Sequence, residues 1–322
     1  MAFSSPLSPA LGDEATGLTR EEYKIKSLDG TEVSLWRIAT RSAAATEDPK
    51  PALIYVSSGP GPLFPEAISV GTVNLDILNR ALIDKLGPKP LHDAGIVLLS
   101  VTHRSGQGSP FSSPVADVYA AYEYALTHGD DLRIQPHNIA MVGLYASGQF
   151  VWSATHIAID LGLPAPCGVM VIDPVFDPKA NWETKEGFEP QSFPRFDEQR
   201  EQIVRRGQKE GWDVVLRRVD FTWFPAIVRK YIGLLQLSRE DLSRLPPMFL
   251  DVGFHSPPKA EVHKAREMLA KANVEVFGYE YLQMKSEHGL SPIFNRTKNG
   301  RREMVEKMRQ DQRQFFEKVW QN

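Results

Sequence analysis

The segment Ile139-Ala-Met-Val-Gly-Leu-Tyr-Ala-Ser-Gly-Gln149 decides the fold that this sequence predicts. It opens with an apolar run typical of a buried strand, passes through a turn of small residues around Tyr145, and leads into the helical pattern of Gln149–Leu161. A sharp turn from strand to helix exposes the side chain at its tip, and some enzymes present a nucleophile in this way. We therefore expect Tyr145 to face a cleft.

Strand-like and helix-like segments alternate on both sides of this turn. The predicted strands are Glu22–Ser27, Val33–Ala39, Pro51–Val56, Gly95–Val101, Ile139–Val142, Val169–Ile172, Pro247–Val252 and Val274–Tyr281. The predicted helices run from about Pro114 to His128, from Gln149 to Leu161 and from Arg301 to Trp320. This alternation predicts an α/β fold with a mostly parallel, doubly wound sheet.

One long segment breaks the alternation. Residues 177–243 are rich in aromatic and charged side chains and contain no strand-like run, so we predict a helical lid inserted into the sheet domain. The 322 residues are close to the upper limit for one hydrophobic core, and we treat 1–322 as a single domain. Residues 1–20, rich in Ser, Pro, Ala and Gly, are expected to be a flexible or capping N-terminus.

Further motifs follow in a definite order. They are Pro51–Gly61, Ser100-Val-Thr-His-Arg104 followed by Asp117, the turn at Tyr145, Asp173-Pro-Val-Phe-Asp177, Leu245–Gly253 and Glu287-His-Gly-Leu290. In this order, over about residues 50–320, the chain resembles the hormone-sensitive-lipase-like (α/β-hydrolase-3) branch of the α/β-hydrolase superfamily. The resemblance implies an α/β-hydrolase fold and a site built from a nucleophilic serine, a histidine and an acid.

The chain departs from the family pattern at the catalytic positions. Tyr145 stands where the family has its serine, and Ser256 stands where it has its acidic residue. In the oxyanion segment, Ser57 replaces a histidine and Pro60 replaces a glycine. Of the three catalytic positions, His288 alone matches the family.

We predict Tyr145 and His288 as the catalytic residues. A phenol has a pKa of about 10, so it stays protonated and can donate a proton or a hydrogen bond to a developing oxyanion. The other candidates are Ser57, Ser58, Gly59, Gly61, Ala146 and Ser147 for an oxyanion pocket, and Ser256, Asp173, Asp177 and Glu261 for the group that orients the histidine.

These residues leave three functions open. The first is an enzyme without a serine nucleophile that acts on a bulky apolar molecule in specialised-metabolite biosynthesis, by dehydration, aldol- or Knoevenagel-type condensation or cyclisation, as a lyase or cyclase. The second is a ligand-binding pseudohydrolase without catalysis. The third is a carboxylesterase with a displaced nucleophile such as Ser57, Ser58 or Ser147. We expect the first.

The composition excludes some classes of binding partner. The net charge of −3 and the absence of a long basic run argue against nucleic acid, and no apolar run is long enough to span a bilayer. The N-terminus lacks the pattern of a signal peptide, so the cytoplasm is the expected location. The one cysteine, Cys167, forms no disulfide within the chain and is expected to be a small buried residue. We expect no metal or other cofactor, and the sequence does not decide between a monomer and a homodimer.

Overall fold

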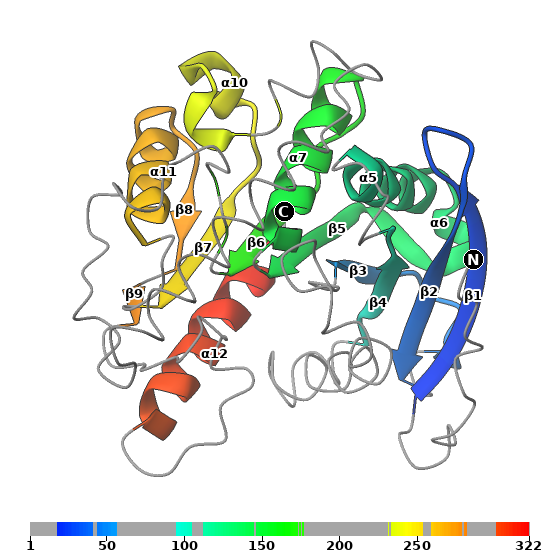
Figure 1. The fold of residues 1–322 in the computed structure, drawn as a ribbon. Coiled ribbons are helices and arrows are strands. Elements are labelled where there is room, and N and C mark those ends of the chain that lie inside the picture. The colour runs from blue at the N-terminus through cyan, green and yellow to red at the C-terminus, as the bar shows by residue number, and fades with distance from the viewer. Residues whose placement is uncertain are drawn as a thin grey trace, which may run out of the picture.

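The computed structural model of the chain describes residues 18–40, 44–56, 95–104, 112–144, 146–172, 174, 176, 231, 233–253, 259–278, 280–281 and 301–321. Nine strands in these ranges join into one sheet (Figure 1). They are β1 (Leu18–Lys26), β2 (Glu32–Thr40), β3 (Lys50–Val56), β4 (Val97–Thr102), β5 (Ile134–Leu144), β6 (Gly168–Ile172), β7 (Met248–Gly253), β8 (Val276–Phe277) and β9 (Glu280–Tyr281).

The strand order is β1-β2-β4-β3-β5-β6-β7-β8, with β9 also paired to β7. The first two strands are antiparallel, and β2 is antiparallel to β4, whereas every pair from β4 to β8 is parallel. The chain passes from β3 to β4 on one side and then crosses back to β5 on the other side of β3. This reversal makes the sheet doubly wound, as predicted, and it places β5 next to β3.

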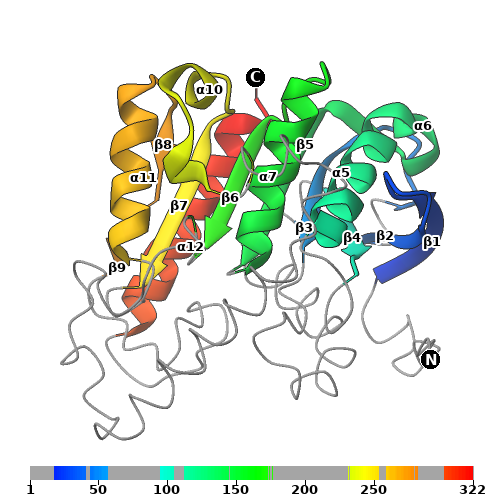
Figure 2. The ribbon, with the colours of Figure 1, turned by 45° about the horizontal axis from the view of Figure 1, so that its top comes forward.

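Helices cover both faces of this sheet. They are α5 (Ser112–Thr127), α6 (Gly129–Leu132), α7 (Ala146–Asp160), α10 (Arg239–Ser243), α11 (Lys259–Lys271), α12 (Arg301–Val319) and the 3-10 turn η3 (Leu234–Gln236). Figure 2 shows α5, α7 and α11 in front of the sheet and α12 behind it. None of the helices that the structure describes is both long enough and apolar enough to cross a membrane.

The central strands are buried on both faces. In β3, Ala52, Ile54 and Val56 belong to the core beneath α5, α7 and α11, whereas Leu53 and Tyr55 belong to the core beneath α12. Side chains of a strand alternate between its two faces, so each face receives every second residue. This is why such strands read in the sequence as continuous apolar runs rather than as alternating patterns.

Most of the predicted elements are confirmed, with boundary shifts of a few residues, but the last strand and one helix differ. The predicted strand Val274–Tyr281 is instead two short strands, β8 and β9, that pair with opposite ends of β7. Gly278 separates them with a left-handed φ of +87°, and a Cβ at this position would lie 2.3 Å from the carbonyl oxygen of Leu250. The chain therefore bends at Gly278 and cannot continue as one regular strand.

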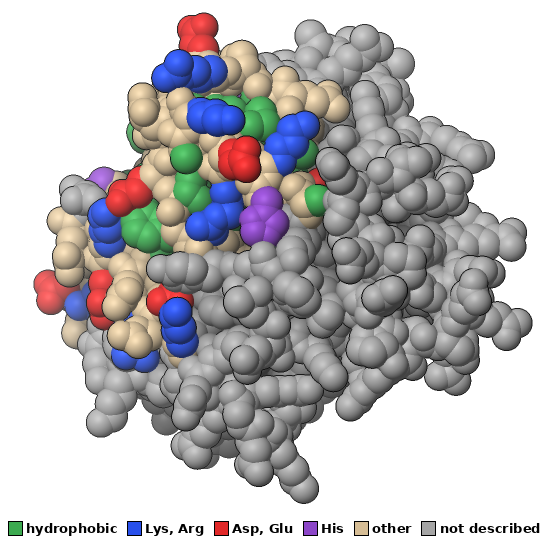
Figure 3. Space-filling model, turned by 90° about the vertical axis from the view of Figure 1, so that its left-hand side faces the viewer, with side chains coloured by type: hydrophobic (Ala, Val, Ile, Leu, Met, Phe, Trp, Pro, Cys, Tyr) green, Lys and Arg blue, Asp and Glu red, His purple; other side chains and the backbone are tan. Residues whose placement is uncertain are grey.

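Helix α11 was not predicted. Its buried residues Val262, Ala265 and Leu269 follow the three-to-four spacing of a helix that packs on one face. The signal was therefore present in the sequence, although charged residues surround it. Figure 3 shows basic and acidic side chains interleaved over the described part of the face on the α11 side, and there they form no concentrated basic patch.

An ion-pair network fixes the carboxyl end of β4. Asp117 of α5 is fully buried and accepts hydrogen bonds from the Arg104 backbone N–H at 2.8 Å and from its guanidinium at 2.6 Å. The same guanidinium contacts Asp29 at 2.5 Å and the Ser27 hydroxyl at 3.1 Å, both in the β1–β2 connection. Arg104 thus joins three parts of the fold, at the two positions that the family resemblance singled out.

A second constraint shapes the turn between β5 and α7. Only Tyr145, which lies outside the described residues, separates the last strand residue, Leu144, from the first helix residue, Ala146. A Cβ on Gly143 would lie 2.4 Å from the carbonyl oxygen of Ser147, which is closer than real Cβ atoms approach. The sharp turn predicted from the sequence is therefore confirmed, and it requires glycine at position 143.

We predict that Asp117→Asn lowers the free energy of unfolding by about 3 kcal/mol, because it leaves the Arg104 guanidinium without its buried carboxylate. Urea denaturation measures this change. The control is Glu22→Gln, which weakens the exposed Lys24–Glu22 ion pair and should cost below about 1 kcal/mol. Equal losses in the two variants would contradict the structural role of the Arg104 network.

We also predict that Gly143→Ala destabilises the protein by about 2–3 kcal/mol, because its methyl group meets backbone that cannot move without shifting α7. The matched control is Gly233→Ala, where the nearest atoms belong to the flexible Gln236 side chain, at 3.3 Å. Thermal unfolding of the two variants provides the comparison. A Gly143→Ala variant as stable as Gly233→Ala would refute the close backbone approach.

Candidate functional site

The carboxyl ends of β3, β4 and β5 meet beside the sharp turn. Val56, the last residue of β3, stands opposite Val101 of β4 on one side and opposite Gly143 of β5 on the other. Ser57 and Ser58 follow Val56 directly in the sequence and lie outside the described residues. The segment that the sequence nominated for an oxyanion pocket therefore begins next to the turn that carries Tyr145.

The N-terminus of α7 supplies electrostatic polarity to this edge. Ala146 is the first residue of α7, and the N–H groups of a first helical turn have no acceptor within their own helix. Together with the helix dipole, such groups attract negative charge. The position of the Ala146 N–H is therefore compatible with the predicted oxyanion role.

Close packing holds this end of α7 against the sheet. A Cβ at Gly148 would lie 3.2 Å from Pro174 and 3.4 Å from Val171 of β6, so a larger residue there would press against both side chains. Ser147, also nominated for the pocket, is completely buried in the first turn of the helix. A buried position beside packed backbone does not suit a nucleophile that must meet a substrate.

Glu261 has a specific partner. It lies in the first turn of α11, is nearly fully buried, and one of its carboxylate oxygens accepts a hydrogen bond of 2.8 Å from the Phe176 N–H. Phe176 belongs to the segment after β6 that carries two other candidate acids, Asp173 and Asp177. Glu261 therefore anchors this segment to α11, a role that the sequence did not predict.

His103 is a buried histidine at the same edge of the sheet. Only 8% of it is exposed. It follows the last residue of β4, and its ring meets the Phe150 ring of α7 edge-on, with a centroid distance of 5.4 Å. Its place at the end of a parallel strand, preceded by a buried apolar run, was the signal available in the sequence.

Most of the predicted lid, residues 177–243, lies outside the described residues. Residues 177–230 lie outside them, and the chain is described again at Tyr231, whose side chain is buried. The Tyr231 carbonyl accepts hydrogen bonds from Ser153 at 2.7 Å and from Gln149 at 3.2 Å, both on α7. The helix that starts at the sharp turn therefore also holds the chain at Tyr231.

Most of the predicted site residues stay predictions. Tyr145, His288, Ser57, Ser58, Gly59, Gly61, Ser256, Asp173 and Asp177 lie outside the described residues. Among the three that are described, Ala146 and Ser147 lie at the turn and Glu261 contacts the segment after β6. The structure thus positions the backbone around the predicted site.

Comparisons with known proteins agree on the fold. A family model described as alpha/beta hydrolase fold, that of the α/β-hydrolase-3 family, matches residues 81–289. A thermostable esterase from Pseudomonas putida is similar in structure, with 19% identity and a TM-score of 0.69 over 94% of this chain and 83% of that one. No curated protein matches the chain in sequence.

Two other solved structures support the same fold. A bacterial heroin esterase shares 20% identity with a TM-score of 0.66, over 92% of this chain and 84% of that one. One of two fungal esterases from Rhizomucor miehei shares 18% identity with a TM-score of 0.66, over 99% of this chain and 93% of that one. Identities this low establish the fold alone.

These findings correct the expected chemistry. The lyase or cyclase function predicted from Tyr145 is contradicted, because the matching family is one of hydrolases and these structures are all of esterases. They favour the carboxylesterase that the sequence had left as an alternative. The family model covers well over half of the chain, and the doubly wound sheet with its sharp turn after β5 agrees with it. The chain belongs to the α/β-hydrolase fold family.

Proposed function

We propose that this protein is a carboxylester hydrolase that acts at the carboxyl edge of its sheet, above the turn between β5 and α7. The observation that carries this proposal is the family match over residues 81–289 together with the close backbone approach at Gly143, which preserves the turn that such enzymes use. The esterase identity of the similar structures supports the same reaction class.

The nucleophile is the part of this proposal that the sequence makes unusual. Tyr145 stands at the tip of the turn, and a phenol with a pKa of about 10 is a poor nucleophile that would also form a reactive ester. Ser147 is completely buried. We therefore assign the nucleophile to Ser57 or Ser58, which in the sequence follow Val56, the β3 residue opposite Gly143.

The reaction then needs a base and an oxyanion site. In this proposal the serine oxygen attacks the ester carbonyl while His288 takes the serine proton, and the histidine returns that proton to the departing alcohol. Water then attacks the acyl-serine with the same histidine as base, which releases the acid and restores the serine. The Ala146 N–H and the Tyr145 hydroxyl stabilise the oxyanion.

The acid that orients His288 comes from the segment after β6. We assign this role to Asp173 or Asp177 rather than to Glu261, because one Glu261 oxygen already holds the Phe176 N–H of that segment. Ser256, at the family's acid position, has no carboxylate with which to stabilise an imidazolium. The aromatic residues of 177–243 suit an ester with a bulky apolar group.

Cys167 is an unsuitable nucleophile. It is partly rather than fully buried at the entry to β6, where it packs against the core beneath α12, and desolvation raises the pKa of the thiol to about 12. A thiol is reactive only as its thiolate. At neutral pH the native Cys167 is therefore almost entirely protonated.

The proposed reaction predicts ester turnover. The protein should hydrolyse p-nitrophenyl butyrate, and removing the nucleophilic serine, by either Ser57→Ala or Ser58→Ala, should lower kcat/KM at least about a thousandfold. Ser34→Ala on the distant β2 is the control and should leave the rate unchanged. Release of p-nitrophenol measures all three variants.

Two results would overturn this proposal. Turnover that survives both substitutions would place the nucleophile elsewhere, whereas the absence of turnover with p-nitrophenyl esters of every chain length would exclude ester hydrolysis. The second result would favour the ligand-binding pseudohydrolase. The measurement to make would then be equilibrium binding of an apolar ester, followed by the quenching of tryptophan fluorescence.

A second prediction concerns pH. The raised pKa means that the native Cys167 thiolate becomes abundant only as the pH approaches about 12, whereas an unfolded thiol titrates near 8.5. At pH 8 the native protein should react with Ellman's reagent about a thousandfold more slowly than the urea-unfolded protein. Equal rates would show that Cys167 is accessible and its pKa ordinary.

A further inference from the structure

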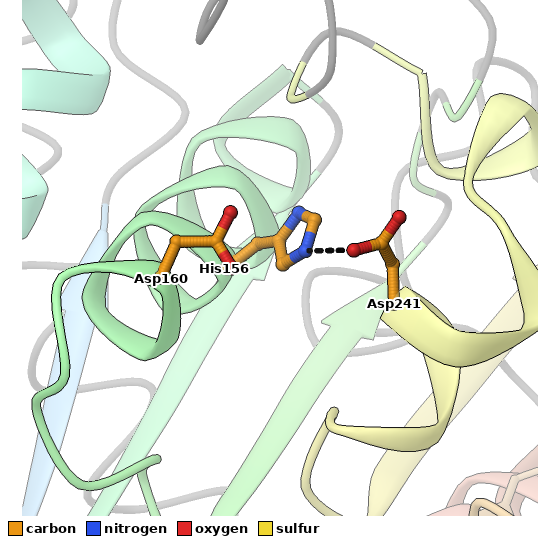
Figure 4. A group of neighbouring side chains, drawn as sticks. All are labelled: His156, Asp160 and Asp241. Atoms are coloured by element: carbon orange, nitrogen blue, oxygen red, sulfur yellow. Dashed lines mark ion pairs between the residues drawn. The ribbon is translucent and has the colours of Figure 1, made fainter.

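Away from the carboxyl edge, three ionisable side chains converge where α7 meets α10. Figure 4 shows the His156 ring pointing toward the Asp241 carboxylate, with Asp160 one turn further along α7. One ligand atom from each of these residues can be chosen so that all three lie within 4.8 Å of one another. We propose that His156, Asp160 and Asp241 bind a divalent transition-metal ion such as Zn²⁺.

The spacing of the helix brings two of the ligands together. His156 and Asp160 are four residues apart on α7, so they lie on the same face of the helix, one above the other. Asp241 comes from α10, which lies beside them. An imidazole with two carboxylates is a donor set that Zn²⁺ accepts, and three protein ligands leave a fourth position for water.

The distance between the ligands also fits an ion. His156 Nε2 lies 3.8 Å from Asp241 Oδ1, whereas a hydrogen bond would be about 3 Å long. Two ligands that each lie about 2.1 Å from a tetrahedral ion are about 3.4 Å apart. A bound ion would therefore require a small movement of His156 and Asp241 and a larger one within the set of three, whose ligand atoms lie within 4.8 Å of one another.

Neighbouring groups hold the two carboxylates in place. Asp241 Oδ2 accepts a hydrogen bond of 2.8 Å from the Ser238 hydroxyl, which leaves Oδ1 directed at His156. Asp160 accepts one of 2.6 Å from the Tyr231 hydroxyl and one of 2.5 Å from Arg244. Each carboxylate oxygen has two lone pairs, and ligating carboxylates usually accept such outer hydrogen bonds.

Two of the three ligands are carboxylates, which attract a cation, and Arg244 pairs with one of them, Asp160. His156 itself is completely buried, and the Tyr231 ring meets it edge-on at 4.8 Å. A metal ion would lie between this imidazole and the two carboxylates.

Such an ion would be structural. His156 lies about 15 Å along α7 from Ala146, at 1.5 Å per residue, so the ion would be remote from the reaction proposed at the turn. It would join α7 to α10 beside Tyr231, where the chain returns from the insertion. The sequence predicted no metal site because its ligands come from two separate segments that only the fold brings together.

The test is titration of EDTA-treated protein with Zn²⁺ in a calorimeter. We expect one ion per chain, a higher Tm with Zn²⁺, and visible absorption when Co²⁺ replaces it. His156→Asn and Asp241→Asn should each weaken Zn²⁺ binding at least about tenfold. His137→Ala removes an exposed histidine elsewhere and should leave binding unchanged.

Asp241→Asn keeps an acceptor for Ser238 and lies at a partly exposed position, so this variant should fold even where His156→Asn does not; circular dichroism checks both. No saturable Zn²⁺ binding, or equal affinity in the Asp241→Asn variant, would overturn the proposal. The cluster would then be an ion pair between protonated His156 and Asp241. Loss of binding in His137→Ala would place the ion at a surface histidine and would overturn it equally.

Discussion

The close approach of Gly143 to the Ser147 carbonyl is the constraint on which the rest of the site depends. With a single residue between β5 and α7, the strand must turn into the helix almost at once, and a Cβ at position 143 would lie 2.4 Å from that oxygen. In the sequence, Tyr145 is the one residue between the strand and the helix. The turn directs the first N–H groups of α7 toward the carboxyl edge of the sheet. The parallel register then sets the end of β3 opposite Gly143, so that the segment starting at Ser57 leaves the sheet beside the turn.

Helix α7 contacts several other parts of the fold along its length. Its first turn packs on β6 through Gly148, its middle holds the Tyr231 carbonyl through Gln149 and Ser153, and its last turn holds the Tyr231 hydroxyl and Arg244 through Asp160. The helix therefore connects the proposed reaction site with the chain at Tyr231 and Arg244. A metal ion at His156 would strengthen this connection without taking part in the chemistry.

The fold could be predicted largely from the sequence because its central strands are buried on both faces. Continuous apolar runs such as Ala52–Val56 are stable only when they are buried. The glycines near Tyr145, Gly143 and Gly148, indicate a sharp turn between the strand and the helix. The break at Gly278 was missed because it depends on how close that residue comes to Leu250 of another strand. The predicted chemistry was wrong for a different reason: Tyr145 was taken to define the reaction, whereas residues 81–289 match the model of an α/β-hydrolase family. The pairing of Glu261 with Phe176 and of His156 with Asp241 links distant segments, and no local pattern reveals it.

The measurement that tests the central claim most directly is the intact mass of the folded protein after exposure to a fluorophosphonate, followed by mapping of the labelled peptide. An esterase with an activated serine at the carboxyl edge predicts one adduct per chain, on the peptide that contains Ser57 and Ser58. The absence of any adduct, or an adduct on a serine far from the turn between β5 and α7, would contradict it.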